Sequence, residues 1–188
     1  MSRVSTLLTS ALFAALATTA HAAPAPAPEA LQSLLSTLNE RLNIGDLVAL
    51  TKWDSGKPIQ DSPREAQVIA NARTLAAERK LDPEEVAQLI AAQMEANKLV
   101  QYGLLAKWQA AGAAPDTPRP DLGKQIRPRL DELQTRLLQQ YADFTPYRHD
   151  PDCTAWLARA RSGLAQDALH ELALIRATGE LCIRATAP

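Results

Sequence analysis

The strongest constraint on the fold is a pair of helix-start signals near the middle of the chain. Ser62-Pro63-Arg64-Glu65 combines a serine N-cap, a proline at the first helical position and a glutamate three residues after the cap. Asp82-Pro83-Glu84-Glu85 repeats this arrangement. We therefore expect one helix from Pro63 to about Arg79, and a longer one that opens at Pro83 and ends near Ala111.

Apolar residues recur at helical spacing through most of the remaining sequence. The pattern predicts a first helix over about 29–53, a fourth over about 122–144, and two shorter helices near 153–162 and 164–178. The expected buried stripe of the first helix is Leu31, Leu34, Leu35, Leu38, Leu42 and Val48. Because no alternating strand pattern of useful length appears, the chain is predicted to be all-α, a single domain of about six helices.

The first 22 residues resemble a secretory signal peptide. They contain Arg3 and no acidic residue, an apolar stretch over 7–17, and Ala20-His21-Ala22 as a cleavage site. A membrane anchor is disfavoured because this stretch is well under the roughly 20 residues that span a bilayer. We expect cleavage near Ala22, an Ala/Pro-rich tether over 23–28, and a soluble mature protein in the periplasm or the medium.

The processed chain would carry little net charge. Removing residues 1–22 leaves 19 basic and 21 acidic residues, a formal charge of −2. This balance gives no electrostatic reason to expect nucleic acid or an anionic membrane as a partner.

The sequence contains two cysteines, Cys153 and Cys182. An exported compartment favours a disulfide between them, which would contribute roughly 3 to 4 kcal/mol on the loop-entropy estimate. Two free thiols or half of a metal site are the alternatives. A metal is disfavoured because His149 and His170 show no ligand spacing to either cysteine.

Polar residues at helical spacing form the most informative anomaly. Arg41 and Lys52 are eleven residues apart, which on a helix is about 1100° and about 16 Å along one face. Asn97 and Gln101 lie one turn apart on another predicted helix, and Arg64 opens a third. Each alone is more simply a solvated side chain, but together they indicate a site for a small polyanion.

These residues and their neighbours match a known family. The matching positions are Arg41, Lys52, Trp53, Pro58, Ile59, Asp61, Arg64, Glu65, Gln93, Asn97, Gln101 and Tyr102. At these spacings the chain resembles the all-helical (type II) chorismate mutases, most strongly over 38–108. The leader, the length and the late cysteine pair resemble the exported, monofunctional subclass.

The resemblance implies a Claisen rearrangement of chorismate to prephenate without a cofactor or a metal. No bond to the enzyme forms, so the protein acts by positioning and electrostatics. Lys52 and Gln101 would be the catalytic donors to the ether oxygen, where negative charge develops in the transition state.

The remaining family positions imply substrate-binding roles. Arg41 and Arg64 would bind carboxylates, for which a bidentate guanidinium is suited. Asn97 would assist a carboxylate, and Asp61 and Glu65 would orient the ring hydroxyl.

In the exported subclass, a further arginine from the C-terminal half completes the pocket within one protomer. Arg127 is the best match, with Arg129 as the alternative. The resemblance thus implies catalytic helices over 29–112, a C-terminal helical extension over 113–188 that closes the pocket, and a homodimer.

Two rival functions remain at this point. An isochorismate pyruvate-lyase uses a similar cationic pocket for a related elimination, although the long loop after the first helix and the cysteine pair favour the mutase. An exported helical module without catalytic activity would instead leave Arg41, Lys52 and Arg64 dispensable.

Overall fold

A computed structural model of the protein describes residues 25–183. Within this range it is helical and contains no strand, which confirms the all-α prediction. Its elements are α1 (Glu29–Ser55), α2 (Ser62–Glu78), α3 (Pro83–Ala111), η1 (Leu122–Ile126), α4 (Arg127–Phe144), η2 (Thr145–Tyr147), α5 (Cys153–Arg161) and α6 (Ala168–Ala177). The predicted signal peptide lies outside the described residues. Among the helices in residues 25–183, none combines the length and apolar character needed to cross a membrane.

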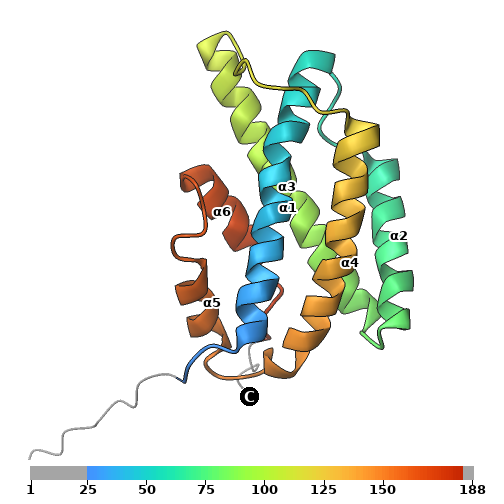
Figure 1. The fold of residues 1–188 in the computed structure, drawn as a ribbon, viewed down its shortest axis with the longest axis vertical. Coiled ribbons are helices and arrows are strands. Elements are labelled where there is room, and N and C mark those ends of the chain that lie inside the picture. Colours follow the sequence, from blue (N-terminus) through green and yellow to red (C-terminus); the bar gives the residue numbers. More distant parts are fainter. Residues whose placement is uncertain (1–24, 184–188) are drawn as a thin grey trace, which may run out of the picture.

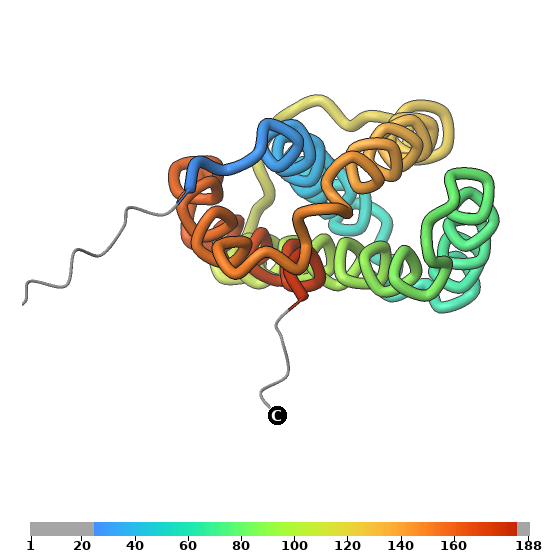
Figure 2. The backbone as a smooth tube through the Cα atoms, turned by 90° about the horizontal axis from the view of Figure 1, so that it is seen from below, coloured from blue at the N-terminus to red at the C-terminus, as the bar shows by residue number. Residues whose placement is uncertain are grey.

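The three longest helices run along the long axis of the molecule (Figure 1). Helices α1, α3 and α4 form its centre, α2 lies on one side, and the short α5 and α6 lie on the other. The view along the bundle shows α2 beside α3 and facing α4 (Figure 2).

The first helix-start signal forms one residue earlier than predicted. Asp61, not Ser62, is the N-cap: its Oδ1 accepts the backbone N–H of Arg64 at 3.2 Å. Glu65 Oε1 in turn accepts the Asp61 N–H at 3.1 Å. The carboxylate is favoured at this position because it complements the positive end of the helix dipole. Consequently α2 begins at Ser62 rather than at Pro63.

The second signal forms as predicted. Asp82 Oδ1 accepts the backbone N–H groups of Glu84 and Glu85 at 2.8 and 2.9 Å, and α3 runs from Pro83 to Ala111.

Two other helix boundaries differ from the sequence prediction. Helix α1 continues to Ser55 and ends at Gly56, whose positive φ of 63° lets its N–H bond the Lys52 carbonyl at 2.9 Å. Helix α6 begins at Ala168 rather than at 164, because the segment from Gly163 (φ 84°) to Asp167 is not helical. Asp167 caps α6 by accepting the His170 N–H at 2.9 Å.

Helix α1 lies at the centre of the core, where it packs against α3, α4, α5 and α6. Every residue of its predicted apolar stripe is buried, with exposures of 0 to 8%. Helices α3 and α4 pack against the stripe, with Leu89 and Ile90 from the former and Leu137 and Leu138 from the latter. Cys153 joins the same core and forms a disulfide with Cys182, with the two Cα atoms 5.8 Å apart. The packed stripe turns the adjacent edge of α1, which carries Arg41 and Lys52, toward α2 and α3.

Candidate active site

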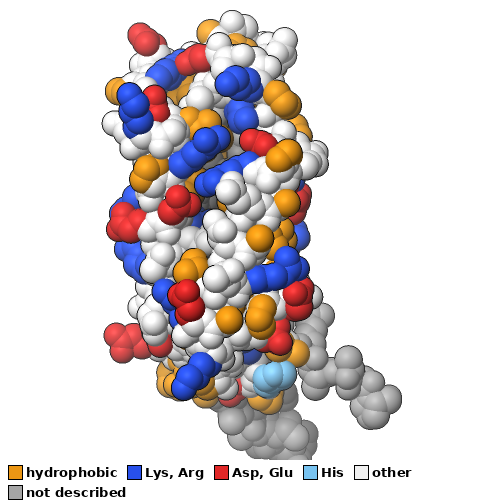
Figure 3. Space-filling model, turned by 90° about the vertical axis from the view of Figure 1, so that its right-hand side faces the viewer, with side chains coloured by type: hydrophobic (Ala, Val, Ile, Leu, Met, Phe, Trp, Pro, Cys, Tyr) orange, Lys and Arg blue, Asp and Glu red, His pale blue; other side chains and the backbone are white. Residues whose placement is uncertain are grey.

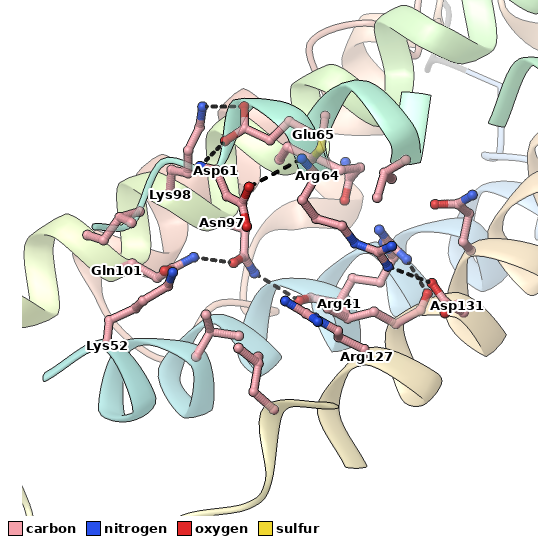
Figure 4. A pocket seen from close by; sticks show the side chains of 18 residues that line it. Arg41, Lys52, Asp61, Arg64, Glu65, Asn97, Lys98, Gln101, Arg127 and Asp131 are labelled. Carbon is pink, nitrogen blue, oxygen red and sulfur yellow. Dashed lines mark hydrogen bonds and ion pairs between the residues drawn. The ribbon is translucent and has the colours of Figure 1, made fainter. Parts of the chain in front are cut away.

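A cavity of about 180 Å³ lies between α1, α2, α3 and the start of α4 (Figure 4). The structure brings together at its walls every polar residue selected from the sequence for substrate or catalysis. These residues are Arg41, Lys52, Asp61, Arg64, Glu65, Asn97, Gln101 and Arg127. The apolar part of the wall is Val48, Ile59, Val68, Met94, Leu122 and Leu130. Within residues 25–183 no cluster of three His, Cys, Asp or Glu side chains could hold a metal ion.

Arg41 is the most deeply buried cation of the site. Arg41 is 8% exposed, and its Nη1 donates a hydrogen bond to the Leu130 carbonyl of α4 at 2.7 Å. Burial lowers the pKa of Arg41 to about 10, an effect that the nearby Asp131 carboxylate partly offsets. The guanidinium therefore stays charged at neutral pH. Its buried Nε has no hydrogen-bond partner among the described residues.

Asn97 and Gln101 form a short hydrogen-bonded chain on α3. Gln101 Nε2 donates to Asn97 Oδ1 at 2.7 Å, and Asn97 Nδ2 donates to the Arg41 backbone carbonyl at 3.3 Å. Gly45 permits this close approach of α1 and α3, since a Cβ there would lie 3.0 Å from Asn97 Nδ2. A primary amide has two N–H donors, so Gln101 keeps one for a ligand.

Lys52 lies at the same end of the cavity as Gln101 (Figure 4). Its Nζ donates to the Pro58 carbonyl of the following loop at 2.6 Å. This contact holds the ammonium in place and uses one of its three donors. The remaining donors of Lys52 and Gln101 can therefore converge on one ligand atom.

Arg64 and its neighbours form the α2 wall. Arg64 Nη1 donates to Gln67 Oε1 at 3.1 Å, and its Nη2 lies 3.8 Å from Asp131 Oδ1. Asp61 and Glu65 line the same wall while also capping α2, so part of their acceptor capacity is already used.

Arg127 lines the cavity, and the alternative Arg129 does not. Arg129 instead forms hydrogen-bonded ion pairs with Glu40 and with Glu132, the latter at 2.6 Å. The difference arises at η1, a single π-helical turn that leads directly into α4 and brings Leu122 and Arg127 to the cavity. The register of the chain after a proline-rich loop decides which arginine faces inward.

Sequence reasoning assigned no role to several polar residues of the wall, although Gln93 is among the positions that carry the resemblance. Lys98 and Asp131 contribute charges, and Gln93 and Gln134 contribute amides. Lys98 directly follows Asn97, and this position could have suggested that it lies near the site. In the sequence, however, it looks like any solvent-exposed lysine on a helix. Asp131 is recognisable only once α4 is placed against α2.

The charges of the wall favour a dianion. The side chains Arg41, Lys52, Arg64, Lys98 and Arg127 are cationic, and Asp61, Glu65 and Asp131 are acidic. The cavity therefore carries two excess positive charges. On the face seen in Figure 3, Lys and Arg side chains gather in the upper half of the molecule, with apolar side chains between them.

Comparison with known proteins points to one family. The pattern of type II chorismate mutases matches residues 32–102. A secreted chorismate mutase of Mycobacterium tuberculosis is 31% identical over 156 residues, which cover 81% of this chain and 78% of the relative. A solved chorismate mutase of Burkholderia phymatum has 45% identity and a TM-score of 0.80, covering 82% of this chain and 97% of that one. A second, from Burkholderia thailandensis, has 33% identity, a TM-score of 0.79, and coverage of 82% and 100%.

Proposed function

The chain belongs to the chorismate mutase family, and we propose that the cavity between α1, α2, α3 and α4 is its active site. As an exported chorismate mutase, the protein rearranges chorismate to prephenate. The observation that carries the site assignment is the pair of donors at one end of the cavity, Lys52 and Gln101, with arginines along the rest of its wall.

The two carboxylates of chorismate account for the excess positive charge. Arg41, held by the Leu130 carbonyl, binds one carboxylate together with Arg127 or Arg64. A guanidinium that a backbone contact already holds in place loses little further conformational entropy when it binds an anion. Asp61 and Glu65 accept from the ring hydroxyl.

The chemical step needs stabilisation of charge on the ether oxygen. As the C–O bond breaks and the new C–C bond forms, negative charge grows on that oxygen, and no group of the protein gains or loses a proton. Lys52 and Gln101 donate to it from positions that are already held by Pro58 and Asn97. Preorganised donors of this kind contribute roughly 10² to 10³ in rate each.

The C-terminal half completes the site within one protomer. Leu122, Arg127 and Leu130 all come from the segment after residue 113. This supports a division into catalytic helices over 29–112 and a closing extension over 113–188. We further propose that the protein is a homodimer of such protomers, exported to the periplasm after cleavage near Ala22. Light scattering and N-terminal sequencing of the secreted protein test these two points.

The decisive experiment incubates the mature protein with chorismate and, separately, with isochorismate. Prephenate from chorismate is the expected product. Salicylate from isochorismate, with no prephenate, would instead assign the lyase activity. Loss of turnover in Arg41→Ala and Lys52→Ala distinguishes the enzyme from a binding module, for which neither residue would matter.

A further inference from the structure

Lys98 joins two helices beside the proposed active site. It lies on α3 directly after Asn97, and its side chain is 14% exposed. The ammonium is 2.7 Å from Glu95 Oε1, on its own helix, and 3.1 Å from Glu65 Oε2, on α2. The contact with Glu95 is an ordinary ion pair within one helix. The contact with Glu65 instead links α3 to α2 at the cavity wall, as Figure 4 shows.

Glu65 is consequently held at both carboxylate oxygens. Its Oε1 accepts the backbone N–H of Asp61 at 3.1 Å, and its Oε2 accepts from Lys98. A glutamate has three side-chain torsions, and contacts from two different elements restrict them to one arrangement. Since a carboxylate has about four acceptor positions, Glu65 can still accept from a ligand hydroxyl.

The ion pair is more than a surface contact. Exposed pairs contribute little because water screens them, whereas both members here are largely covered, with Glu65 at 23% exposure. Burial would lower the pKa of Lys98, but its hydrogen bonds to Glu95 and Glu65 raise it above the ordinary value. Lys98 therefore remains a cation in a place where an unpaired lysine would be unfavourable.

We propose that Lys98 is a positioning residue: it holds the Glu65 carboxylate in the orientation that accepts the ring hydroxyl of the substrate. This rests on the function proposed above, in which Glu65 faces that hydroxyl. Lys98 acts through Glu65 and makes no contact with the reacting atoms. The hydroxyl is present in substrate and transition state alike, so the contribution of Lys98 is to binding rather than to the chemical step.

A double-mutant cycle tests this inference. Lys98→Met should raise KM for chorismate roughly tenfold, the scale of one charge-assisted hydrogen bond, with a smaller change in kcat. Lys98→Arg, which keeps a charged donor, should recover most of the loss. In a Glu65→Gln background Lys98→Met should have no further effect on KM. Glu95→Gln is the matched control: it removes the partner of Lys98 outside the cavity and should leave KM unchanged.

The outcomes separate the inference from the site assignment. A further rise in KM when Lys98→Met is added to Glu65→Gln would mean that Lys98 binds the substrate directly, which overturns the inference and leaves Glu65 in its role. An unchanged KM in Glu65→Gln alone would overturn both. Helical circular dichroism and thermal unfolding of each variant establish that it is folded, and Lys98→Gln replaces the methionine variant if that one is not.

Discussion

Gln101 donates a hydrogen bond from its side-chain nitrogen to Oδ1 of Asn97, at 2.7 Å and one helical turn away. Both residues line the cavity, and Gln101 is buried at 5% exposure. Both side chains are uncharged amides that do not titrate. The donor that we assign to the ether oxygen is therefore present at any pH at which the protein is folded.

The first prediction is that kcat/KM is nearly independent of pH between about 5 and 9, and that Gln101→Glu confines activity to acid. A carboxylate at this position would face the Asn97 oxygen in a buried place, and both conditions favour its protonated, donating form. Activity of the variant should thus fall as pH rises. Rate profiles of both proteins provide the measurement, and identical profiles would remove Gln101 from the catalytic set.

The second prediction concerns the charge at Lys52. Lys52→Ala should lower kcat by roughly 10²-fold or more, with a smaller effect on KM, because its donor acts mainly in the transition state. Lys57→Ala is a suitable control, since Lys57 is exposed and does not line the cavity. A loss seen in KM alone would assign Lys52 to substrate binding.

The third prediction separates the two candidate arginines of the C-terminal half. Arg127→Ala should raise KM by roughly 10- to 100-fold, the scale of a lost contact to a carboxylate. Arg129→Ala should leave KM unchanged, because Arg129 pairs with Glu40 and Glu132 away from the cavity. Steady-state kinetics of the two variants decide between them, and the reverse result would place Arg129 in the site.

The fourth prediction is a decrease in stability at alkaline pH caused by His170. Its buried ring lies with Nδ1 and Nε2 each 2.9 Å from a carboxylate, of Asp167 and Asp46 respectively. Burial would lower the pKa of His170, but these two hydrogen bonds raise it above its ordinary value of 6.5. Because the folded-state pKa is the higher one, the stabilisation is complete below the unfolded pKa and is lost as pH rises through the folded value.

Denaturant titrations across pH 5 to 9 check this expectation. The free energy of unfolding should fall by at most about 1.4 kcal/mol per pH unit for the one proton involved. His170→Gln should remove this slope. If the slope persists in the variant, another group is responsible for it.

The fifth prediction concerns the disulfide that joins α5 to the C-terminal segment. Replacing Cys153 and Cys182 by serine should reduce the free energy of unfolding by about 3 to 4 kcal/mol. Neither cysteine lines the cavity, so kcat/KM should be retained at temperatures where the variant is folded. The parent protein in a reducing agent should reproduce this loss, and equal stability of oxidised and reduced protein would contradict it.

Much of the fold could be predicted because its signals are local. Caps and apolar spacing depend on residues within a few turns, so Asp82 and the buried stripe of α1 were identified correctly. The Ser62 prediction was wrong by one residue, since Asp61 offers the better acceptor at the same turn. The start of α6 was misplaced because apolar spacing continues through a segment that Gly163 and Asp167 keep out of the helix.

By itself, the sequence determined the main helices and which of their polar residues share a face, because helical geometry places residues eleven or four apart on one side. The catalytic roles of Lys52 and Gln101 came from the resemblance to the family and remain predictions. Only the tertiary structure showed that Arg127 rather than Arg129 lines the cavity, because this depends on how the loop before α4 passes α1. Arg119 fixes this crossing by donating to Asp54 at 2.9 Å. The tertiary structure likewise showed that Lys98 contacts Glu65, because a contact between α2 and α3 depends on helix packing and cannot be predicted from residue spacing within one helix.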